Sequence, residues 1–206
     1  MSLRSRVALV AALAVPLALV TQVASAQTAG AAAKAPPAAE QIAAAILALP
    51  KEMQANAGVM GYRTPGKLEM LRPAKNDMLC LADDPADDQF HVSCYHTSME
   101  PFMARGRALR EGGTKGAQVD TARFAEVKSG KLKMPTAPAS LYQIFGPKDA
   151  FDPATGTVSK SKALIVVYVP FATEATTGLS ARPSETKPWL MFPGTPKAHI
   201  MFSSSM

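Results

Sequence analysis

The chain contains few of the residues that usually mark an active site. In 206 residues it has 3 histidines, 2 cysteines and 1 tryptophan, and aromatic residues make up 6% of the composition. It also lacks a Gly-x-Ser-x-Gly nucleophile elbow, a phosphate-binding glycine loop, a His-Glu-x-x-His motif and a Cys-x-x-Cys-His haem attachment site. These absences favour a binding module over an enzyme, and we expect no cofactor.

The sequence also lacks an apolar stretch of the roughly 20 residues that a membrane-spanning helix requires. The longest apolar run, Val7 to Val20, follows Arg4 and Arg6 and precedes the small residues Ala24-Ser25-Ala26. This order is typical of a cleavable signal peptide. We therefore predict a signal peptide over residues 1–26, with export to the periplasm or out of the cell. We expect the mature chain to be soluble and to have no membrane span.

Charge excludes one class of partner. The net charge of +6 falls to +4 without the leader, because the leader contains two arginines and no acidic residue. The remaining basic residues are scattered, apart from a short cluster at Arg105, Arg107 and Arg110, whereas nucleic-acid binders concentrate them on one face. We expect a small ligand or an envelope component as partner, and no nucleic acid.

The mature chain divides into a tether and one domain. Residues 27–37 are rich in alanine and proline and are predicted to form a flexible tether, and residues 38–206 are long enough for a single domain. Strands and helices do not alternate, so we predict an α+β domain with a mainly antiparallel sheet and helices packed on one face. The predicted helices cover residues 38–50, 51–57, 98–112 and 119–129, and Pro50 is expected to break the first from the second. The predicted strands cover residues 58–62, 67–71, 77–81, 141–145, 162–169 and 198–202, of which 162–169 has the strongest apolar signal. The first two strands are predicted to form a hairpin with a turn at Pro65-Gly66.

The two cysteines are Cys80 and Cys94. Because export delivers the chain to an oxidising compartment, we predict that they form a structural disulfide. The alternative is that free thiols bind a metal ion together with neighbouring histidines.

The three histidines are the remaining chemically informative residues. His91 and His96 flank Cys94 and Tyr95, and His199 lies near the C-terminus. Imidazole and thiolate suit zinc or copper, but on a strand His91 and His96 would face opposite sides, so a shared ion would require a turn between them. A metal-assisted hydrolase or a periplasmic metal-binding protein that uses these histidines is therefore the alternative function.

Two further features of the sequence are a tryptophan that joins the predicted binding surface and an acidic segment. Trp189 belongs to an apolar patch, Trp189 to Phe192, that needs cover, and it joins Tyr95 and the three histidines as a candidate ligand-binding residue. The four aspartates between Asp83 and Asp88 do not follow the spacing of a calcium-binding loop and are interpreted as a solvated acidic turn.

The order Leu71-Arg72, Asn76, Cys80, Asp83-Asp84-Pro85 and Cys94, with the stretch Pro193 to Met201, resembles that of a group of uncharacterised secreted bacterial proteins. The resemblance implies export and the pairing of the two cysteines. It implies no activity, ligand or cofactor, and it makes His199 the first residue to test.

Overall fold

The computed structural model describes residues 34–64 and 66–204. The predicted signal peptide, the first part of the tether and Pro65 of the predicted turn lie outside these residues. The helices are α1 (Ala38–Ala45), α2 (Lys51–Gln54), α3 (Glu100–Glu111), α4 (Ala117–Lys128) and α5 (Glu174–Thr177), with 3₁₀ turns η1 (Ile46–Ala48) and η2 (Thr97–Met99). The strands are β1 (Gly58–Thr64), β2 (Lys67–Arg72), β3 (Met78–Leu81), β4 (Gln89–His96), β5 (Ala139–Pro147), β6 (Phe151–Asp152), β7 (Thr157–Val158), β8 (Lys162–Tyr168), β9 (Trp189–Met191) and β10 (His199–Ser204).

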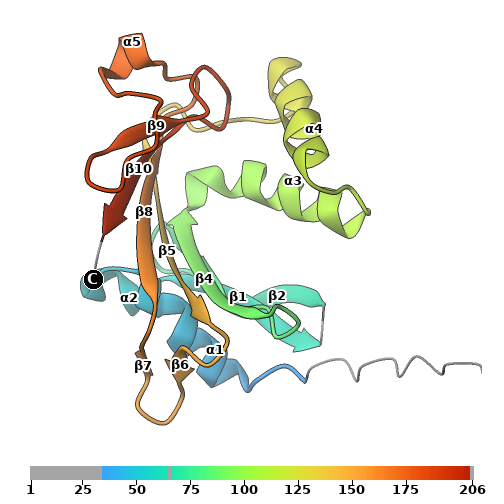
Figure 1. Ribbon diagram of the computed structural model, residues 1–206. Helices are drawn as coiled ribbons and strands as arrows, with labels where there is room; N and C mark the ends of the chain where they lie inside the picture. The colour runs from blue at the N-terminus through green and yellow to red at the C-terminus, as the bar shows by residue number, and fades with distance from the viewer. Residues whose placement is uncertain (1–33, 65, 205–206) are drawn as a thin grey trace, which may run out of the picture. The chain divides into compact units, whose positions relative to one another are not determined.

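Eight of the strands in the described part of the chain form one sheet in the order β2-β1-β3-β4-β5-β8-β10-β9 (Figure 1). Every neighbouring pair is antiparallel except β1 and β3, which are parallel. Strands β6 and β7 form a separate short hairpin. The predicted α+β class with a mainly antiparallel sheet is confirmed.

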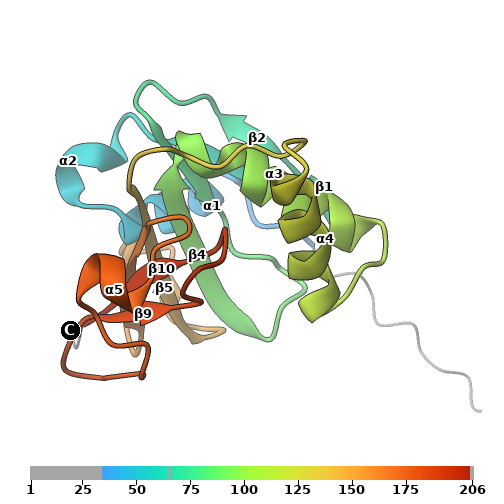
Figure 2. The same ribbon diagram turned by 90° about the horizontal axis from the view of Figure 1, so that it is seen from above.

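Helices cover both faces of the sheet, whereas the sequence analysis placed them on one. Phe90, Val92 and Cys94 of β4 pack with α1 and η1 in one core cluster, while Tyr95 packs with α3 in a second cluster. Successive residues of a strand point to opposite faces, so a central strand with apolar residues on both sides needs cover on both. Figure 1 and Figure 2 both show α3 next to α4, and Figure 1 shows α1 and α2 below them, beyond β4.

Strand β4 is the main element that the sequence analysis missed. Its residues pair with β3 on one side and β5 on the other, so it lies in the middle of the sheet. Polar residues at Gln89, His91 and Ser93 hide its apolar character, because each alternates with a buried neighbour. The register places Cys80 of β3 opposite Cys94 of β4, and the predicted disulfide between them is present.

Most of the other predicted elements are confirmed with shifts of one or two residues. The predicted hairpin is β1 and β2, the two predicted longer helices are α3 and α4, and the strand with the strongest apolar signal is β8, inside the sheet. Pro50 separates η1 from α2, as expected of a residue that has no backbone N–H to donate. No helix among residues 34–64 and 66–204 is long and apolar enough to cross a bilayer.

Gln41 fastens α1 to strand β1. Its side-chain amide accepts a hydrogen bond from the Tyr62 N–H at 2.7 Å and donates one to the Tyr62 carbonyl at 2.7 Å, and the residue is 5% exposed. We expect Gln41→Ala to lower the free energy of unfolding by about 2 kcal/mol, because both backbone groups lose their partner. Urea denaturation measures this loss. The exposed Gln118→Ala is the control and should stay within about 0.5 kcal/mol of the wild type, and an equal effect of both changes would contradict the assignment.

Candidate functional site

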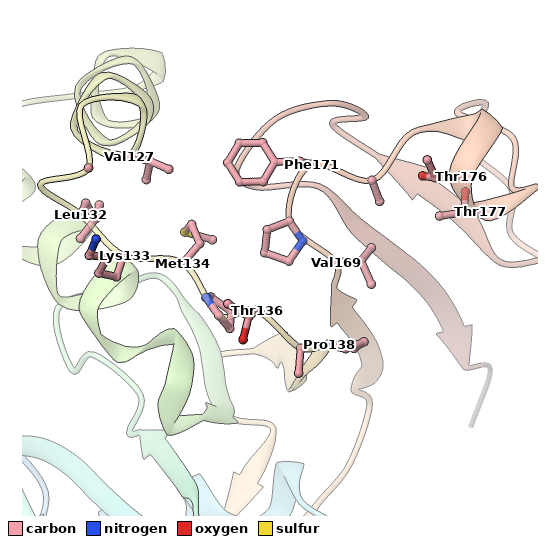
Figure 3. Close-up of a pocket in the computed structure, with 15 residues that line it drawn as sticks. Val127, Leu132, Lys133, Met134, Thr136, Pro138, Val169, Phe171, Thr176 and Thr177 are labelled. Carbon is pink, nitrogen blue, oxygen red and sulfur yellow. The ribbon is translucent and has the colours of Figure 1, made fainter.

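Two hollows lie beside the C-terminal half of the sheet. The larger one, of about 750 Å³, is formed by residues 127–138 and 169–177. Figure 3 shows Val127, Leu132 and Met134 facing Phe171 and Val169 across it. Its walls are mainly apolar and rich in proline. We call it the proline-walled cavity, and it contains no histidine, carboxylate or tyrosine among its lining residues.

The smaller hollow, of about 270 Å³, lies on the sheet face that α3 also covers, and we call it the His199 groove. It combines an apolar surface with four polar side chains. The apolar lining is Leu141, Leu164, Val166, Met191, Phe192 and Met201, and the polar lining is Gln143, Tyr168, Lys197 and His199. This groove collects the titratable groups that could recognise a ligand.

His199 is held in one protonation state. It is 5% exposed, and its Nδ1 lies 2.7 Å from the carbonyl oxygen of Lys197. A carbonyl oxygen can only accept, so Nδ1 carries the proton and Nε2 is left as an acceptor. Burial lowers the pKa of His199 below its ordinary value, although the hydrogen bond to the carbonyl acts in the opposite direction. The ring is therefore neutral at pH 7, and Nε2 can accept a hydrogen bond from a ligand.

Tyr168 packs against His199 and contributes the complementary group. The two ring centroids are 5.1 Å apart, and burial raises the pKa of Tyr168 to about 12, so its hydroxyl stays protonated. No described residue hydrogen-bonds to Tyr168 Oη or to His199 Nε2. Neither atom is among the buried, unpartnered atoms of the described residues, so neither is fully buried. Both residues line the groove, which thus has one donor and one acceptor on adjacent rings.

A three-residue charge cluster borders this pair. Asp120 of α4 accepts hydrogen bonds from Arg123 and, at 2.8 Å, from Lys197 Nζ. Burial alone would raise the pKa of Asp120, but the two cationic partners outweigh it and lower the pKa below its usual value. The Asp120 carboxylate therefore forms ion pairs with both Arg123 and Lys197, and the three residues together have a net charge of +1.

Arg123 is the most buried charged residue of the cluster, at 4% exposure. Its guanidinium stacks on the Phe102 ring at 3.9 Å and donates to the Phe102 carbonyl at 3.2 Å. Its Nε is the one buried side-chain polar atom of the described chain without a hydrogen-bond partner. The guanidinium is thus fixed between α3 and α4. This contact holds α4 in a position where Asp120 reaches Lys197.

Phe192 forms part of the wall of the groove, and Phe171 lines the neighbouring proline-walled cavity. Phe192 and Phe171 have positive φ angles of 54° and 64°, an unfavourable conformation for bulky residues that is often retained at functional sites. Their loops are joined by hydrogen bonds from Phe171 N to Thr195 O and from Gly194 N to Ala172 O. The arrangement holds the Phe192 ring 4.7 Å from Lys197 Nζ and 5.7 Å from the His199 ring.

Of the five predicted ligand-binding residues, His199 lines this groove and Trp189 lies on the same face of the sheet. Trp189 pairs with Met201 in the register of β9 and β10, and directly paired residues point to the same face of a sheet, so the Trp189 side chain lies on the groove side.

The other three predicted residues lie elsewhere. Tyr95 is in the core, where its hydroxyl donates to Glu100 at 2.5 Å and accepts from Arg107 at 2.9 Å. His96 accepts a hydrogen bond from the Ser98 N–H at the start of η2. His91 is exposed beside Asp87 and Asp88 in a separate shallow hollow.

The histidines considered for a metal site are not brought together. His91 and His96 lie on one continuous strand, which separates them by about 16 Å and directs them to opposite faces. The described residues contain no group of three or more His, Cys, Asp or Glu side chains placed to hold a metal ion. In the acidic turn, Asp83 accepts hydrogen bonds from the His91 N–H and from Lys148, which is a structural use of its carboxylate.

Sequence reasoning missed Tyr168, Lys197, Asp120 and Arg123. Tyr168 belongs to a strand that was predicted from its apolar residues, and Asp120 and Arg123 belong to a predicted helix, but no motif marks them as site residues. The burial of Arg123 is the feature that sets this group apart, and no sequence pattern shows it.

Comparison of the chain with models of protein families, with curated proteins and with solved structures finds no match.

Proposed function

We propose that this chain is an exported, disulfide-locked binding module that holds a small amphipathic ligand in the His199 groove. The observation that carries the proposal is the pair formed by Tyr168 Oη and His199 Nε2, a donor and an acceptor without a described partner in a hollow whose lining is mainly apolar. Ligand sites combine apolar walls with a few placed polar groups in this way. Export is supported by the leader pattern and by the disulfide between Cys80 and Cys94.

A non-catalytic role fits the groove better than a hydrolytic one. His199 has no carboxylate on Nδ1 to support it as a base, because that atom is occupied by a backbone carbonyl. The groove lining includes no serine, threonine or cysteine that His199 could activate. The described groups bind and orient a ligand, and the metal-dependent alternative has less support because its histidines are far apart.

A ligand in this groove should change the fluorescence of Trp189, which is the one tryptophan of the chain. We expect 1,3-decanediol, which has an apolar chain and two hydroxyls, to shift the emission saturably and to release heat in calorimetry. His199→Asn should weaken this binding about five-fold, because the shorter amide can still donate to Lys197 O but offers no acceptor at the position of Nε2.

His96→Asn is the matched control, since His96 lies at the end of β4 and does not line the groove. It should bind as the wild type does. The proposal fails if the diol gives neither a saturable shift nor heat at millimolar concentration. It also fails if both histidine variants lose affinity equally while their circular dichroism remains native.

A further inference from the structure

Beyond the donor and acceptor of Tyr168 and His199, the charges around the groove favour a ligand of one sign. Lys197 lines the groove, and its side chain is 24% exposed. Asp120 is its only described ion-pair partner, and Asp120 also neutralises Arg123, whose side chain is 4% exposed. None of the residues lining the groove is acidic. The cluster of Asp120, Arg123 and Lys197 therefore leaves one positive charge uncompensated beside the groove.

We propose that the ligand of the His199 groove is an aliphatic organic monoanion, whose carboxylate-type head contacts Lys197 and Tyr168. This inference rests on the proposed function and adds the chemical class of the ligand. An anionic head would complete the charge balance of the cluster and accept hydrogen bonds from Lys197 Nζ and Tyr168 Oη, which are both donors. The apolar body would lie on Leu164, Val166 and Met201.

His199 adds a second requirement at the same end of the ligand. Its Nε2 is an acceptor, and a carboxylate next to it would face a lone pair rather than a donor. A hydroxyl close to the carboxylate satisfies this atom. The ligand class is then a free hydroxy acid with an aliphatic chain. The hydroxyacyl groups of envelope lipids share the chain and the hydroxyl but lack the carboxylate charge.

Three chain-matched probes separate charge from hydroxyl: 3-hydroxydecanoate, decanoate and 1,3-decanediol. Trp189 fluorescence and calorimetry at low ionic strength and pH 8 measure their affinities. We expect 3-hydroxydecanoate to bind at least ten-fold more tightly than the diol and several-fold more tightly than decanoate. Replacing the free acid with its methyl ester tests the source, because an esterified acyl group lacks the charge and should bind as weakly as the diol.

Lys197→Met should remove the preference for 3-hydroxydecanoate over the diol, because the acid loses an ion pair with Nζ whereas the uncharged diol loses at most a hydrogen bond. Lys51→Met, a change at an exposed lysine of α2, is the matched control and should keep the preference. Equal affinity of the acid and the diol in the wild type would overturn the inference and leave the proposed function standing. A preference that survives Lys197→Met also overturns it, and failure of all probes to bind overturns the proposed function itself.

Discussion

Replacing Cys80 and Cys94 with alanine will lower the free energy of unfolding by about 3 kcal/mol, which is the effect of opening a loop of this size in the unfolded chain. The two residues are 14 apart in sequence, lie opposite each other on β3 and β4, and are both fully buried. The bridge therefore joins the strands that connect the N-terminal part of the sheet to its centre. Urea denaturation should show the midpoint falling by about 1 to 3 M.

Reduction of the wild type provides an internal check on this prediction. Dithiothreitol should lower the wild-type midpoint toward that of the double variant and should leave the variant unchanged. An unaltered midpoint in both the reduced wild type and the variant would show that the crosslink does not stabilise the fold. Partial loss of binding without loss of stability would be equally inconsistent, because the disulfide does not line the His199 groove.

The second large effect is expected from Asp120→Asn, which should lower the free energy of unfolding by about 3 kcal/mol. The change removes the one carboxylate shared by Arg123 and Lys197, and Arg123 cannot reach water because it is 4% exposed. An unpaired buried charge is more damaging than the loss of one ion pair. Thermal and urea denaturation measure the loss.

Lys197→Met is the matched control for this cluster. It leaves the ion pair between Asp120 and Arg123 in place, so it should destabilise the protein by less than about 1 kcal/mol. If Lys197→Met destabilises the protein as much as Asp120→Asn, the shared carboxylate is not what stabilises the packing of α4 on α3.

Acid titration gives the same cluster a second test. The pKa of Asp120 in the folded protein lies below its ordinary value, so its contribution to stability is present above about pH 4 and is lost as the pH falls through the folded pKa. The difference between the wild type and Asp120→Asn should therefore be constant from pH 7 to pH 5 and should shrink toward pH 2. A difference that grows in acid would contradict the ion-pair assignment.

Patterns of neighbouring residues were enough to predict several helices and strands. The apolar residues of β8, the break at Pro50 and the apolar stripe of α3 each follow from residues that are close in sequence. The pairing of Cys80 with Cys94 was predictable because the chain has no other cysteine. Strand β4 was missed because Gln89, His91 and Ser93 interrupt its apolar residues, although the four residues from Val92 to Tyr95 are all buried.

The candidate site was predictable only in part. His199 stood out because histidine is rare in this chain, and Trp189 because a large apolar side chain needs cover. Tyr95 and His96 shared these signals but serve the core and the start of a helix. Composition and local spacing draw attention to reactive residue types without showing which of them reach a common hollow.

The sequence by itself determined the single pair of cysteines, the leader pattern and the local preference of most segments for helix or strand, because each depends on neighbouring residues. The tertiary structure alone decided that Asp120, Arg123, Tyr168, Lys197 and His199 form one cluster. These residues come from α4, β8, β10 and the loop that precedes β10, and they are up to 79 positions apart in the numbering. Their meeting depends on the order of strands in the sheet and on the packing of α4 against α3, and no periodicity in a linear chain encodes a contact over that separation.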